Sequence, residues 1–155
     1  RGLKPGQAAA NCCICPAPGP VKVSAMSCAI VLLTHPGLGH ALQEVAQRLL
    51  GALPLHCQSI DVPYDQDPAL LLQPALALMH NLDTGDGILL LTDLYGASPS
   101  NLASQLQHHH RHCRRVSGVN LPMLLRVMNY PDLALDRLTL IAADAPRNGA
   151  IVDNA

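Results

Sequence analysis

Aromatic residues are nearly absent from this sequence, which has no Trp, no Phe and only 3 Tyr. Proteins that hold single-stranded nucleic acid stack its bases on aromatic side chains, so the chain offers no such platform. The chain also has no large excess of charge of either sign, because it contains 10 Lys and Arg and 11 Asp and Glu. Without a basic surface, we expect no binding to nucleic acid or to an anionic membrane.

Long apolar runs are also lacking. No stretch approaches the roughly 18 apolar residues that a transmembrane helix requires, so we expect no direct insertion into a membrane. Hydrophobic residues still make up 49% of the 155 positions, which is enough for the aliphatic core of one domain. The first 25 residues differ, because Gly, Pro and Ala dominate there without periodicity. We expect residues 1–25 to be a disordered extension or an upstream-translated segment, and 26–155 to be the functional domain.

The 6 cysteines do not form the pattern of a secreted disulfide protein. Cys12, Cys13 and Cys15 sit together, whereas the others are scattered through an aliphatic chain. We therefore expect a cytoplasmic protein in which Cys28 and Cys57 are buried as small apolar residues. The cluster near the start lacks a second ligand pair at zinc spacing, and no nucleotide-binding glycine loop is present. We expect no metal and no cofactor.

Apolar runs alternate with segments of helical periodicity along the rest of the chain. Expected strands span 28–34, 55–62, 88–93 and 115–117, with a short one at 149–152; expected helices span 38–50, 68–82, 99–107, 122–128 and 132–143. Pro74 should strain or kink the second helix. This alternation indicates an open, doubly wound α/β sheet that is mainly parallel.

The stretch 89–101, LLLTDLYGASPSN, combines an acid at a strand end with the start of a helix. Ser98 is expected to cap that helix, with Pro99 at its first position. Free N–H groups and the positive end of the helix dipole favour a phosphate there. An ordinary turn, in which Asp93 only caps or meets solvent, remains open from this pattern alone.

His35 directly follows the first expected strand, and this residue supplies a nucleophile. In doubly wound sheets, ligands bind at the carboxyl ends of the strands where the strand order reverses, and in the flavodoxin-like order this point lies between the first and third strands. A carboxylate on one ring nitrogen, from Asp93, fixes the tautomer while the other nitrogen attacks. Gly37 and Gly96 let the backbone approach a phosphoryl group, and Ser98 could hold its oxygens. These residues favour phosphoryl capture on His35.

Other histidines are weaker candidates. His40 is the competitor of His35, but its place in the helical pattern predicts exposure on the helix surface. His56 and His80 are expected to be ordinary surface or partly buried residues. The run 108–112, HHHRH, suggests metal, yet no acid or cysteine pair completes a site. We interpret it as a solvated helix end, where cationic side chains are favourable.

Three segments together resemble the IIA component of the mannose-type bacterial sugar phosphotransferase system: 31–37 (VLLTHPG), 90–101 (LLTDLYGASPSN) and 117–124 (SGVNLPML). The resemblance implies a parallel sheet of order 2-1-3-4 with helices on both faces. It also implies a fifth, antiparallel strand exchanged between the subunits of a homodimer, which would be 149–152 here.

The resemblance assigns roles as well. It implies that His35 accepts a phosphoryl group from the phosphocarrier HPr on Nε2 and passes it to a IIB component. Asp93 matches the acid that bonds the imidazole, and Ser98 matches a serine near the phosphoryl group. Ala97 and Ser100 depart from the family pattern, which has a glycine and an aromatic there, and this bears on partner docking.

Two alternatives stay open beside the sugar phosphocarrier. The chain is expected to lack a fused IIB domain, so it could instead be a stand-alone regulatory component whose phosphorylation switches partner binding. The phosphotransfer subunit of a dihydroxyacetone kinase shares the fold, although the segment 118–124 disfavours it.

Overall fold

A computed structural model of the chain describes residues 27–65 and 67–149. Its centre is a sheet of four parallel strands in the order β2-β1-β3-β4. The strands are β1 (Ala29–Thr34), β2 (Cys57–Asp61), β3 (Ile88–Thr92) and β4 (Cys113–Ser117). The α/β class predicted from the sequence pattern and the order 2-1-3-4 implied by the resemblance are both confirmed.

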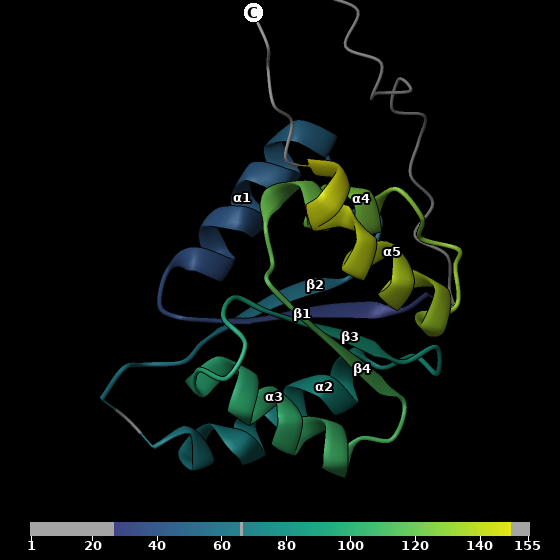
Figure 1. The fold of residues 1–155 in the computed structure, drawn as a ribbon. Helices are drawn as coiled ribbons and strands as arrows, with labels where there is room; N and C mark the ends of the chain where they lie inside the picture. Colours follow the sequence, from purple (N-terminus) through teal and green to yellow (C-terminus); the bar gives the residue numbers. More distant parts are fainter. Residues whose placement is uncertain (1–26, 66, 150–155) are drawn as a thin grey trace, which may run out of the picture.

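Helices cover both faces of the sheet (Figure 1). One face carries α1 (Leu38–Leu50), α4 (Leu121–Met128) and α5 (Leu135–Gly149), and the other carries α2 (Leu72–Leu82) and α3 (Ser98–His109). Side chains alternate along a strand, so each central strand feeds two cores. Ile30 packs in the core under α4 and α5, while its neighbour Val31 packs in the core over α2 and α3. The uninterrupted apolar runs follow from this burial on both faces.

Helix α1 packs closely on the sheet through Gly39. A Cβ at this position would overlap Ser59 Oγ and lie 2.9 Å from Thr34 Oγ1. The Gly39 N–H donates to Thr34 Oγ1 at 2.8 Å, which ties the first turn of α1 to the last residue of β1. The absence of a side chain here therefore sets how closely α1 approaches the strand ends.

The predicted helix over 68–82 is divided in the structure. A 3₁₀ turn, η1 (Pro68–Leu71), comes first, and its N-cap Asp67 accepts from Ala69 N at 2.9 Å. Helix α2 begins only at Leu72, which places Pro74 in its first turn. Because N–H groups of the first turn have no intrahelical partner, a proline is tolerated there. The irregularity expected near Pro74 is thus present as the break between η1 and α2, which precedes the proline.

The end of the chain also differs from expectation. The last described helix is α5 (Leu135–Gly149), which begins and ends later than the predicted 132–143. Gly149, predicted as the start of a strand, is helical and is the last described residue. The rest of the predicted strand 149–152 lies outside the described residues, so the fifth strand and the dimer exchange stay predictions. The expected extension, residues 1–25, lies outside them too. Within 27–65 and 67–149, no helix has the length and apolarity needed to cross a membrane.

Candidate functional site

His35 and Asp93 meet at the carboxyl end of the sheet. His35 directly follows β1 and Asp93 directly follows β3, and these strands are paired with Leu33 opposite Thr92. The His35 ring Nδ1 lies 2.7 Å from Asp93 Oδ2, and the backbone N–H of His35 donates to the same oxygen at 2.7 Å. The pairing expected from topology is therefore present, and one carboxylate oxygen of Asp93 contacts both the backbone nitrogen and the ring Nδ1 of His35.

Hydrogen bonds set the ionisation of Asp93. Burial by itself would raise the pKa of this carboxyl, but bonds from the His35 and Leu94 backbone N–H groups and from the His35 ring outweigh it, so the pKa is lowered. An ionised carboxylate only accepts, so Nδ1 must carry the proton. In the neutral imidazole this leaves the lone pair on Nε2. The side chain of His35 remains 24% exposed while that of Asp93 is 10% exposed, so a reactant can reach the histidine.

The loop that carries His35 is held on its other side by Asp61, the last residue of β2. Its Oδ1 accepts from the backbone N–H of Gly37 at 3.2 Å. Gly37 has φ of +85°, a conformation that side chains with a Cβ rarely adopt. The loop is thus fixed between the ends of β2 and β3, and a glycine is required at its turn.

Helix α3 starts five residues beyond Asp93. Its N-cap is Ala97, with no capping side chain, and Ser98 is the first helical residue. The expected cap at Ser98 is one residue off, because Pro99 is as acceptable at the second helical position as at the first. Helical geometry leaves the N–H of Ser98 without an intrahelical carbonyl. Gly96, at φ +82°, turns the chain from Asp93 into this helix.

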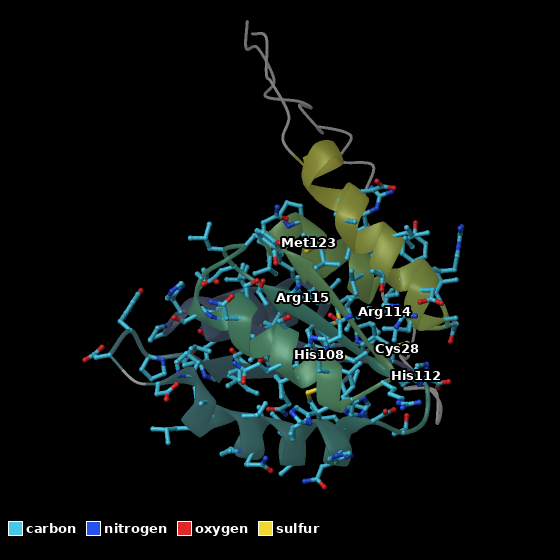
Figure 2. The ribbon with its side chains drawn as sticks, turned by 60° about the horizontal axis from the view of Figure 1, so that its bottom comes forward. Cys28, His108, His112, Arg114, Arg115 and Met123 are labelled. Atoms are coloured by element: carbon cyan, nitrogen blue, oxygen red, sulfur yellow. The ribbon has the colours of Figure 1, made fainter. Side chains whose placement is uncertain are left out.

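The structure also shows what surrounds Ser100, one of the two departures from the family pattern. Its side chain is buried at 1% exposure, and its carbonyl accepts from Arg115 Nη1 at 2.8 Å. The neighbouring Arg114 instead pairs with Asp136 on α5 at 2.8 Å. Adjacent arginines of the edge strand β4 therefore reach the two opposite helix layers (Figure 2).

Comparison with known sequences decides the family. The sequence model described as PTS system fructose IIA component matches residues 29–135, which is more than half of the chain. Both strand ends that carry His35 and Asp93 lie inside the match. The chain belongs to this IIA family. Its members are phosphotransferase components of the sugar phosphotransferase system.

Two curated relatives from Escherichia coli strain K12 agree with this assignment. The IIA chain is 31% identical over 98 residues to YadI, named as a phosphotransferase enzyme IIA component, and 32% identical over 126 residues to the mannose-specific EIIAB component of the PTS. These alignments cover 63% and 80% of this chain. They span 66% of YadI and only 39% of the EIIAB component.

Solved structures confirm the fold. The mannose/sorbose-specific IIA subunit from Enterococcus faecalis superposes with a TM-score of 0.74 at 19% identity, covering 84% of this chain and 97% of that subunit. The IIA component from Streptococcus agalactiae superposes with a TM-score of 0.66 at 22% identity, covering 81% and 95%. At these identities the likeness concerns the arrangement of the backbone.

The competing histidine of the IIA chain lies where the sequence predicted. His40 is on the surface of α1 with its side chain 63% exposed, and its Nε2 is 3.8 Å from Asp61 Oδ2. Such an exposed pair contributes little. His56 and His80 are exposed as well. None of these three residues is held as His35 is, which Asp93 contacts at both the ring and the backbone N–H.

The histidine run is only partly a solvated helix end. His108 and His112 are exposed near the end of α3 and the start of β4 (Figure 2). His110, by contrast, is 8% exposed, and its Nε2 lies 3.2 Å from Asp83 Oδ2. The interpretation as solvated was wrong for His110, because its ring contacts Asp83 and the ring of His80, whose centroid lies 5.5 Å away. In the described part of the chain, no group of three or more His, Cys, Asp or Glu side chains could hold a metal ion.

Sequence reasoning missed two residues of the site. Asp61 was counted only as part of a strand, although it ends β2 beside β1 and so had to lie near the His35 loop. Tyr64 was unassigned, yet its ring stacks on the His35 imidazole with centroids 5.0 Å apart and an interplanar angle of 17°. The available signal was the scarcity of aromatics together with the position of Tyr64 just after a strand end.

Proposed function

We propose that this IIA-family chain is a phosphocarrier: His35 Nε2 accepts a phosphoryl group from phosphorylated HPr and passes it to a IIB component. The observation that carries the proposal is the 2.7 Å contact between His35 Nδ1 and Asp93 Oδ2 at an accessible strand end. That contact leaves the far ring nitrogen as the nucleophile. The resemblance also extends the proposal to a cytoplasmic homodimer joined through 149–152.

The proposed reaction is a direct transfer of the phosphoryl group from the donor atom of HPr to Nε2 of His35. The lone pair of Nε2 forms the new bond to phosphorus while the bond from phosphorus to the donor atom of HPr breaks, and that electron pair returns to HPr. Positive charge develops on the imidazole as the bond forms. The ionised Asp93, bonded to Nδ1–H, stabilises this charge and keeps the ring in the reactive tautomer. In the transfer to IIB, an acceptor atom of IIB forms the new bond to phosphorus while the bond from phosphorus to Nε2 breaks, and that electron pair returns to the imidazole.

We assign the three oxygens of the phosphoryl group to the start of α3. Ser98 is half-buried at the first helical position, where its N–H and hydroxyl can both donate. The positive end of the helix dipole adds to the attraction for an anion. Gly37 and Gly96 both turn at positive φ on either side of the site, and without side chains they leave room for a partner's phosphoryl group.

Apolar side chains beside the site suit the docking of HPr and IIB. Leu94 and Tyr95, directly after Asp93, are 62% and 77% exposed, and Leu38, at the start of α1, is 42% exposed. Transient interfaces are small, and their centres are enriched in aromatic residues and depleted of charged ones. Because both partners must reach the same Nε2, we expect them to use this surface in succession.

Labelling with phosphoenolpyruvate, enzyme I and HPr tests the proposal. The wild-type chain should gain a phosphoryl group that is labile in acid and stable in base, and H35A should gain none. H40A is the matched control, since His40 lies on the same helix-loop segment but has only the 3.8 Å pairing with the half-buried Asp61. Full labelling of H35A, or loss of label only in H40A, would falsify the assignment.

A chase distinguishes the carrier from the regulatory alternative. After removal of enzyme I and HPr, the labelled protein is mixed with candidate IIB components. Transfer of label to a IIB component supports the carrier. A label that stays on His35 with every IIB component, while the phosphorylated form binds another protein, identifies a regulatory switch.

A further inference from the structure

An aromatic ring covers one face of the His35 imidazole. Tyr64 stacks on it with centroids 5.0 Å apart and planes inclined by only 17°. This tyrosine is 75% exposed, so the core does not require it. In a chain with 3 Tyr and no other aromatic, one of them lies directly against the proposed nucleophile.

The backbone brings Tyr64 to this place. Val62, at 0% exposure, donates from its N–H to the carbonyl of Thr34 at 2.9 Å, which ties the segment after β2 to the residue before His35. Pro63 follows and restricts the backbone. Tyr64 is therefore presented over the end of β1 by a segment anchored on β1 itself.

The two contacts of the imidazole restrict different motions. A hydrogen bond at Nδ1 lies in the plane of the ring and fixes where that nitrogen points, but it permits the ring to tilt about the bond. A stacked ring restricts this tilt. Together Asp93 and Tyr64 direct Nε2 of His35 along one line, and attack on phosphorus depends steeply on such alignment. The π face also favours the positive charge that develops on the imidazole.

We propose that Tyr64 is a positioning residue for phosphoryl transfer through His35, a role that rests on the proposed function above. Tyr64 acts through its ring and not through its hydroxyl. Phenylalanine should therefore replace it, whereas alanine should not. A stacked pair of rings corresponds to about a 3- to 10-fold effect on rate, which is the loss we expect in Y64A.

Single-turnover transfer from phosphorylated HPr tests this role in Y64A and Y64F. Y130A is the control, because Tyr130 is also exposed but lies far from His35. It follows α4 and precedes Pro131, which lines a hollow together with Cys28, at the end of the sheet opposite to His35. Rates are measured across a range of HPr concentrations. A positioning residue lowers the maximal rate, whereas a docking residue raises the concentration needed for half-maximal rate.

The ring protons of His35 provide a second readout. The Tyr64 ring current should shift their resonances upfield in wild type and Y64F, and the shift should be lost in Y64A and kept in Y130A. Support for the role requires this pattern together with a lower maximal rate in Y64A only. A normal rate in Y64A, a Y64F variant as slow as Y64A, or a change confined to half-saturation overturns it. If wild type takes no label at all, the proposed function fails and this role falls with it.

Discussion

Replacing Asp93 by asparagine removes the negative charge of the carboxylate together with one of its two acceptor oxygens. The carboxylate accepts three N–H groups: the His35 backbone and ring Nδ1 at 2.7 Å each on Oδ2, and the Leu94 backbone at 2.7 Å on Oδ1. Asparagine has one acceptor oxygen and one NH2 group. In either orientation of the amide, the NH2 faces at least one donor, so D93N cannot reproduce the arrangement.

The size of the effect follows from the kind of hydrogen bond that is lost. A bond to a charged group is worth about 1.5–3 kcal/mol, against about 0.5–1.5 kcal/mol for a neutral pair. The bond to Nδ1 strengthens as the ring becomes positive, so most of this difference acts on the transition state. With a factor of ten for each ~1.4 kcal/mol, a difference of about 1–1.5 kcal/mol should slow transfer to His35 by about 5- to 12-fold.

Quenched single-turnover transfer from phosphorylated HPr measures this loss, with near-ultraviolet circular dichroism as a check on the fold. D61N is the matched control, because it removes a carboxylate charge at the neighbouring strand end while its amide oxygen can still accept from Gly37 N–H. D61N should transfer at nearly the wild-type rate. A D93N protein as fast as wild type, or an equal loss in D61N, would refute the assigned role of Asp93.

Three further predictions concern stability and reactivity. Because the pKa of Asp93 is lowered in the folded protein, its ionisation stabilises the fold above the ordinary carboxyl pKa, and this contribution is lost as pH falls through the folded value. In urea unfolding, the difference in unfolding free energy between wild type and D93N should therefore shrink toward acid pH. A difference that stays constant with pH would contradict this. G39A should cost about 1–3 kcal/mol of unfolding free energy in the same assay, because the added Cβ overlaps Ser59 Oγ; a neutral result would show that α1 can move away. Burial raises the pKa of the Cys28 thiol to about 11 and the pKa of the Cys57 and Cys113 thiols to about 12. Iodoacetamide should therefore modify these three thiols only in urea, with the modified sites mapped by mass spectrometry. Modification of these thiols in the folded protein would disprove their burial.

The parts of the fold that the sequence predicted are those with a strong local signal. The strands β1 and β3 are buried at every position and apolar up to the threonine that ends each of them, because both faces of the sheet are covered. Their carboxyl ends had to meet once the sheet was parallel. This is why the pairing of His35 with Asp93 could be expected without coordinates. The buried Cys28 and Cys57 followed from the same reasoning and are confirmed.

The features that the sequence missed depend on contacts between distant segments or on positions that are locally equivalent. A proline is accepted at either of the first two helical positions, so the pattern around Ser98 left the start of α3 uncertain by one residue. The burial of His110 depends on the return of the chain into β4 and on Asp83 across from it. Tyr64 reaches His35 only because its segment is tied to β1.

Two groups of His35 share one oxygen of Asp93, and this should make phosphorylation of the ring detectable from the backbone. Because Asp93 Oδ2 holds both the ring and the backbone N–H of His35, and Oδ1 holds the N–H of Leu94, a change of charge on the imidazole alters the electron density at both amides. Their NMR resonances come from residues 59 positions apart in the sequence, 35 and 94. They should shift together on phosphorylation, so the occupancy of the ring could be followed from the backbone without a label on the phosphoryl group.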